Sequence, residues 1–207
     1  MQLQRLSVGT LALVALAAGF SCTDSTAPSA EERAATDLRL LAAPYGTPAL
    51  ANPSVSFYAV KGKNSGADIW YRPREGRSDS TKFLEFRLGG ASLDRRPDGT
   101  SIAQGDSVLI TVTVTDPTHF IVEFQPSGLR FSANDLPTLK ISFAACGDDL
   151  NYDGKVDATD ATMQASLSVW RQESPFQPWT RVTSTVTSSV KDVDARLGGF
   201  TGYALMW

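Results

Sequence analysis

Residues 149–160 carry oxygen-bearing side chains at a spacing that suits a metal ion. Within this stretch, Asp or Asn stands at the first, third and fifth positions, and Asp stands at the ninth and twelfth. Gly154 holds the sixth position, where a loop that wraps around a cation must turn sharply. The pattern predicts a site for a hard cation such as Ca²⁺, which prefers carboxylate and carbonyl oxygens.

Each position of this loop has an expected role. Val156 is expected to point inward and anchor the loop on the core, and the bound ion is expected to be structural. An affinity of about 10⁻⁴–10⁻³ M is typical of extracellular modules. The predicted ligands are the side chains of Asp149, Asn151 and Asp153, the backbone carbonyl of Lys155, the side chain of Asp157 (directly or through water) and the side chain of Asp160.

The alternative interpretation of the loop is an acidic surface turn, because Asp, Asn and Gly are ordinary turn residues. Two observations favour the metal. The carboxylates of Asp149, Asp153, Asp157 and Asp160 repel one another unless something screens them. In addition, the connection over residues 147–165 is longer than most connections within a domain, and a cation would order it.

The motif resembles the calcium loop of dockerins and other extracellular EF-hand-like modules. It keeps their Asp-x-Asn-x-Asp-Gly-x-Val-Asp-x-x-Asp pattern but has a bulky Tyr152 at the fourth position and Ala161 after the twelfth. The sequence contains no second copy, so the resemblance does not imply binding to cohesins. No helix is expected to enter the loop, and a short helix over residues 158–165 is expected to leave it.

The elements that must hold this loop are predicted to be β-strands. Apolar and polar residues alternate most clearly over residues 107–115, and no segment after residue 51 has a sustained helical period. We expect an all-β fold, an antiparallel β-sandwich or partly open barrel with an inserted EF-hand-like loop and at most one short helix. Further strand candidates are residues 55–60, 68–72, 84–88, 120–124, 139–143, 166–171, 180–188 and 201–207.

Part of this strand pattern resembles the ZU5-type β-domain. The resemblance is carried by residues 120–131, with a Pro-Ser-Gly turn between two strands, by the Pro-led strand over residues 136–141, and by the closing segment 199–205. It covers about residues 100–207. ZU5 domains are interaction modules without catalytic residues, so the resemblance implies binding or scaffolding.

The N-terminus is typical of an exported protein. Residues 1–22 have a short positive start, an apolar run and a Ser-Cys ending, and Cys22 resembles the lipidation site of bacterial lipoproteins. Residues 23–53 are rich in Ser, Thr, Pro and Ala and are predicted to be a flexible tether to a single domain over residues 54–207. We therefore expect a lipid-anchored protein of the bacterial outer membrane or cell surface, with secretion or a periplasmic location as the alternative.

Composition limits the partners. The net charge of −3 offers no electrostatic case for nucleic acid, and a membrane would be contacted through the lipid anchor alone. With Cys22 lipidated, Cys146 has no disulfide partner and is expected to be a small buried hydrophobe. The expected partner is a protein or polysaccharide at the cell surface whose identity the residues do not specify.

The sequence offers weak signals for enzymatic activity. His119 is the only histidine, no nucleophile motif accompanies it, and we predict a protein that is not an enzyme. A hydrolase would need His119 beside a Ser or Asp in a cleft. A carbohydrate-binding module would instead need exposed aromatic residues, for which the candidates are Trp70, Tyr71, Trp170 and Trp179.

Overall fold

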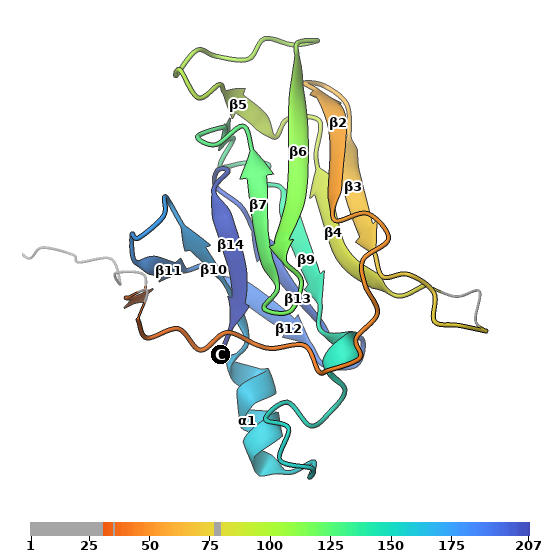
Figure 1. Ribbon diagram of the computed structural model, residues 1–207. Helices are drawn as coiled ribbons and strands as arrows, with labels where there is room; N and C mark the ends of the chain where they lie inside the picture. Colours follow the sequence, from red (N-terminus) through yellow and green to blue (C-terminus); the bar gives the residue numbers. More distant parts are fainter. Residues whose placement is uncertain (1–30, 35, 77–79) are drawn as a thin grey trace, which may run out of the picture.

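The computed structural model describes residues 31–34, 36–76 and 80–207, and in it two antiparallel sheets pack face to face (Figure 1). The predicted signal peptide, Cys22 and the first part of the predicted tether lie outside the described residues. The order in the first, seven-stranded sheet is β1 (Glu32–Arg33), β11 (Trp179–Arg181), β10 (Ser168–Gln172), β14 (Gly202–Met206), β7 (Ile121–Gln125), β6 (Ser107–Asp116) and β2 (Ser54–Val60).

The second sheet has five strands and packs against the inner face of the first. A separate two-stranded ladder joins β5 (Leu93–Arg95) to β8 (Arg130–Phe131). The order in the second sheet is β12 (Ser184–Thr187), β13 (Asp192–Arg196), β9 (Thr138–Ser142), β4 (Lys82–Leu88) and β3 (Ser65–Trp70). The all-β, antiparallel sandwich expected from the alternating pattern is therefore confirmed.

Alternation along the strands places apolar side chains between the sheets. In β6 every second residue is buried, and the residues between are exposed or half-buried. The centre of the core is aromatic: the ring centroid of Phe124 lies 5.0 Å from that of Phe86, 4.9 Å from Phe200 and 5.6 Å from Tyr203. These four side chains are fully buried, and each contributes roughly 1.5–3 kcal/mol by leaving water.

Several strand assignments differ from the expectation, and β1 and β5 were not among the candidates. Residues 180–188 were expected to form one strand, but the chain passes from β11 in the first sheet to β12 in the second. The pattern missed β13, whose Val193 and Ala195 face the core while Asp192 and Asp194 lie near the Lys140 ammonium, at 3.8 and 3.6 Å.

Residues 38–50, called the strap below, lie along the edge of the domain rather than forming a free tether. The Leu41 N–H donates to the Leu205 carbonyl at 3.1 Å, and the Ala43 N–H donates to the Thr118 carbonyl at 2.7 Å. The Leu41 side chain is fully buried and Leu50 is buried as well. Burial of these two side chains holds the strap, so the expected boundary at residue 54 is too late.

The strap also covers part of the outer face of the first sheet. Because side chains alternate along β14, Tyr203 and Leu205 enter the core while Ala204 and Met206 form a second apolar cluster with Trp170 and Trp179. The strap's Leu38 and Leu40 pack on this second cluster.

The connection from β9 to β10 links the two sheets and projects from one end of the sandwich (Figure 1). It contains a 3₁₀ turn η1 (Ala144–Cys146), the candidate metal loop and α1 (Ala158–Ser166). The expected short exiting helix is thus present. Among the described residues, no helix has the length and apolar character to span a membrane.

Candidate metal-binding loop

The first half of the loop is folded by its own side chains. The Gly154 N–H donates to Asp149 Oδ2 at 2.9 Å, the Asp153 N–H donates to Asn151 Oδ1 at 3.0 Å, and the Lys155 N–H donates to Asp153 Oδ1 at 2.9 Å. Such bonds arise where short polar side chains cap the turn that follows them. Gly154 has φ of 85°, which a residue without Cβ adopts freely. Asp149 and Asp153 therefore each accept a backbone hydrogen bond through one carboxylate oxygen.

Asp149 keeps an oxygen that has no partner. Its Oδ1 atom is buried and accepts no hydrogen bond from the described residues. A buried acceptor left unsatisfied costs roughly 1–3 kcal/mol, and more where the group is charged. A cation at this oxygen would remove that cost. Asp149 stands at the first position of the loop, where a calcium loop places its first ligand.

The second half of the loop is a helix start. Asp157 is the N-cap of α1 and its Oδ1 accepts from the Thr159 N–H at 2.7 Å. The Asp160 Oδ2 accepts in return from the Asp157 N–H at 2.9 Å, which completes a capping box. The helix α1 therefore begins after the ninth position of the loop, where the exiting helix of an EF-hand-like loop is also expected to begin.

Asp160 ties the two halves together. Its side chain is 2 % exposed, and its Oδ1 accepts from the Leu150 N–H at 2.7 Å and the Asn151 N–H at 3.2 Å. Hydrogen bonds from the Asp157, Leu150 and Asn151 N–H groups lower the pKa of Asp160, because all of them favour the charged carboxylate. The carboxylate at the twelfth position thus closes the loop on itself.

The predicted ligands share one loop, but they do not all converge on one point. Within residues 31–34, 36–76 and 80–207, no group of three or more His, Cys, Asp or Glu side chains is arranged to hold a metal ion. Asp153 and Lys155 are exposed, Asn151 is half-buried, and Asp157 and Asp160 are engaged with backbone N–H groups. To complete an oxygen shell, the loop would have to exchange some of these backbone bonds for bonds to the ion.

One anchoring residue was predicted wrongly. Val156, expected to point into the core, is 69 % exposed. Leu150, at the second position, is buried and joins the main hydrophobic cluster together with Met163 of α1. Gly154 turns the chain outward, so Val156, which follows it, faces solvent. Leu150, which precedes the turns, anchors the loop in the core.

Tyr152 and Cys146 make contacts that sequence reasoning missed. The Tyr152 hydroxyl donates to the Ala42 carbonyl of the strap, and Cys146 Sγ lies 3.7 Å from the same oxygen. Burial raises the pKa of the Cys146 thiol to about 11. Cys146 is buried as expected and lies in η1. The bulk of Tyr152 at the fourth position was the available signal.

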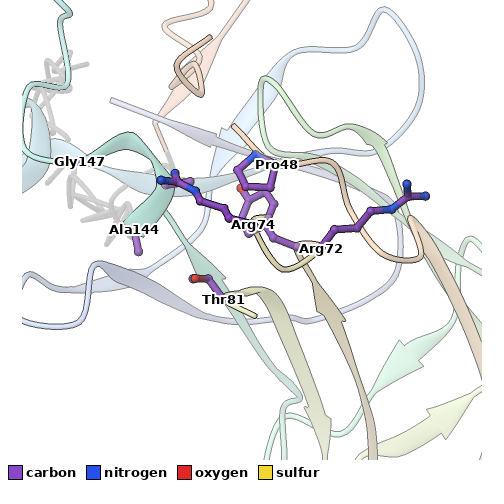
Figure 2. Close-up of a pocket in the computed structure, with 8 residues that line it drawn as sticks. Pro48, Arg72, Arg74, Thr81, Ala144 and Gly147 are labelled. Atoms are coloured by element: carbon purple, nitrogen blue, oxygen red, sulfur yellow. The ribbon is translucent and has the colours of Figure 1, made fainter. Parts of the chain in front are cut away.

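A cavity of about 450 Å³ lies between η1, the strap and the segment that follows β3. In Figure 2 the Arg74 side chain extends toward Ala144 and Gly147, whereas the Arg72 side chain points away from them. Because the two guanidinium groups diverge, they do not form a joint clamp for an anion. The cavity is the space between η1 and the β3–β4 connection.

The aromatic residues considered for sugar binding do not form a platform. Tyr71, Trp170 and Trp179 are buried, and Trp70 alone of the four is partly exposed, at 38 %. The Lys82 ammonium lies 5.0 Å from the Trp70 ring centroid. A sugar-binding row needs several exposed rings side by side, and these four do not provide one.

His119 belongs to a turn. Its Nδ1 lies 2.7 Å from Asp116 Oδ2, and the Asp116 Oδ1 accepts from the Thr118 and His119 N–H groups, so the carboxylate caps the β6–β7 connection. The pair therefore has a structural explanation at the tip of the hairpin. A nucleophile in contact with His119 would be needed to turn this pair into a catalytic one.

Comparison with known proteins finds no matching family model, no similar curated protein and no similar solved structure. The resemblances to ZU5-type domains and to dockerin loops stay predictions.

Proposed function

We propose that this chain is a calcium-stabilised, non-enzymatic interaction or structural module of an exported, lipid-anchored protein. The observation that carries the calcium assignment is the buried, unpartnered Oδ1 of Asp149 at the first position of the loop. The side-chain caps at the third and fifth positions and the helix start after the ninth support the same assignment.

The ligand set suits Ca²⁺ because it consists of hard oxygen donors. Asp149, Asn151, Asp153, Asp157 and Asp160 supply side-chain oxygens and Lys155 supplies a carbonyl. When bound, the ion would neutralise part of the negative charge in the loop. The residues would hold the ion and pin the β9–β10 connection, which is a structural role. The partner of this protein is a protein or polysaccharide at the cell surface. It would bind a domain in which calcium has made the loop end more rigid.

Thermal unfolding of the purified domain with Ca²⁺ and with EDTA tests this proposal. At a free calcium concentration of 100 times the dissociation constant, linkage adds about 2.7 kcal/mol to the free energy of unfolding. The stabilisation should vanish in Asp149→Ala, which removes the unpartnered oxygen. Asp148→Ala is the matched control, because Asp148 is a neighbouring exposed carboxylate outside the twelve positions. Its ion pair with Lys191, at 2.7 Å, affects the melting temperature in Ca²⁺ and in EDTA alike, so the difference between the two conditions should be kept. A melting temperature that is the same in Ca²⁺ and EDTA would refute the assignment.

Lipid anchoring is tested separately. Cys22→Ser should move the protein from the membrane fraction to the soluble fraction of the exporting cell. An unchanged membrane fraction would contradict lipidation and leave the calcium proposal intact.

A further inference from the structure

The metal loop touches the strap at one defined point. Tyr152, at the fourth position of the loop, has φ of 57°, and its hydroxyl donates to the Ala42 carbonyl. The Cys146 thiol lies against the same carbonyl from the adjoining 3₁₀ turn. Two side chains of the β9–β10 connection therefore meet one backbone oxygen of the strap.

The strap is attached to the first sheet on both sides of that oxygen. The Leu41 N–H donates to the Leu205 carbonyl on β14, and the Ala43 N–H donates to the Thr118 carbonyl in the β6–β7 connection. The Leu41 side chain fills the core. Ala42 consequently faces the loop while its neighbours are bonded to the first sheet, so the contact joins the loop to the segment that leads toward the N-terminus.

Tyr152 is well placed to transmit the state of the loop. Its backbone lies between Asn151 and Asp153, whose side chains cap consecutive turns. The caps and the Tyr152–Ala42 hydrogen bond are all formed in the structure. An ion held by Asn151 and Asp153 would restrict the Tyr152 backbone further, and a ring with less freedom would make its hydrogen bond to Ala42 more often.

We propose that Ca²⁺ in the loop strengthens the docking of the strap through the Tyr152 hydroxyl, so that the metal controls how firmly the N-terminal segment is held on the domain. This inference rests on the proposed calcium site. Coupling of this kind is reciprocal: a docked strap raises the calcium affinity by the same factor by which calcium favours docking. For a single neutral hydrogen bond of ordinary strength, that factor is about fivefold.

Hydrogen exchange of the full domain measures this coupling. The Leu41 and Ala43 amides report on the strap, and the amides of β6, which is paired with a strand on each side, report on global unfolding. In the wild-type protein, saturating Ca²⁺ should slow exchange at both sets. In Tyr152→Phe, which removes the hydroxyl alone, Ca²⁺ should still slow exchange in β6 but should lose its local effect on the strap.

Tyr58→Phe is the matched control, because Tyr58 is an exposed tyrosine on β2, outside the strap and the loop. It should behave as the wild type does. Calcium affinity should be up to about fivefold weaker in Tyr152→Phe and unchanged in Tyr58→Phe.

Each other outcome is decisive. If Ca²⁺ protects β6 but leaves the strap unchanged in the wild type, the coupling is wrong and the calcium site stands. If the strap is protected equally in the wild type and in Tyr152→Phe, the hydroxyl is not the link and the inference is overturned. If Ca²⁺ changes neither set of amides, the proposed site fails and the coupling fails with it.

Discussion

The centre of the sandwich and the loop at its end are stabilised by different means. Between the sheets, Phe86, Phe124 and Phe200 are fully buried and contact one another through apolar surface. In the loop, residues 152–159 are all exposed, and the chain is held by hydrogen bonds from its own side chains. Burial of apolar surface stabilises the sandwich without any ligand, whereas the loop concentrates negative charge that a cation would offset.

This contrast shows which part of the molecule should respond to its surroundings. Burial of apolar surface does not depend on divalent ions, so the core should be indifferent to chelators. The loop carries an unpartnered carboxylate oxygen and should respond to them. The strap lies between the two, because Leu41 belongs to the core and Ala42 touches the loop.

The substitution that should destabilise the protein most lies in the core. Phe124→Ala removes a ring that contacts Phe86, Phe200 and Tyr203, and should lower the free energy of unfolding by about 3–5 kcal/mol. Chemical denaturation measures this loss. The gain in stability from Ca²⁺ should be the same in Phe124→Ala as in the wild type. Phe176→Ala is the control, since Phe176 is exposed and its loss should change little.

The strap gives the next largest effect. Leu41→Ala should cost about 2–5 kcal/mol, because it removes a fully buried side chain. Denaturant unfolding measures the cost, and limited proteolysis should show earlier cleavage within residues 38–50. Substitution of the neighbouring, fully exposed Tyr45 by Ala should leave both measurements near the wild type. If Leu41→Ala is as stable as the wild type and residues 38–50 are cleaved equally fast in both proteins, the strap is a tether after all.

The smallest effect concerns pH. The pKa of Asp160 is lowered in the folded protein by backbone N–H groups. Its contribution to stability is therefore complete at neutral pH and is lost as the pH falls through the folded pKa, below the usual aspartate range. The stability difference between the wild type and Asp160→Asn should accordingly shrink in acid. A stability difference between the wild type and Asp160→Asn that stays constant with pH would contradict this explanation.

The sequence predicted those strands in which the inward positions are apolar and the outward positions are polar. Alternation over residues 107–115 identified β6, because its inward positions are all apolar. It failed for residues 180–188, where Thr and Ser dominate and the switch between sheets leaves no trace in the pattern. It missed β13 because charged residues, two of them near Lys140, surround the Val193 and Ala195 that face the core.

Composition misjudged the strap for a similar reason. Averaged over residues 23–53, the segment is small and polar, and average composition conceals the few side chains that bind it to the domain. Leu41 and Leu50 supply most of that attachment. Their partners, on β14 and beside β3, are distant in sequence and could be recognised only in the folded molecule.

In the loop, spacing predicted the local turns and the start of α1, because both depend on neighbours within a few residues. It could not predict which apolar residue anchors the loop, since that depends on the direction of the chain after Gly154. The bulk of Tyr152 was a local signal, but its partner Ala42 is 110 residues away in the sequence and could not be predicted from it.

A calorimetric titration of the purified domain with Ca²⁺ shows whether the loop at residues 149–160 binds a cation. We expect one ion to bind per chain at about 10⁻⁴–10⁻³ M, with binding retained in Asp148→Ala and abolished in Asp149→Ala. The absence of binding heat at several millimolar Ca²⁺, or equal binding by Asp149→Ala, would contradict it.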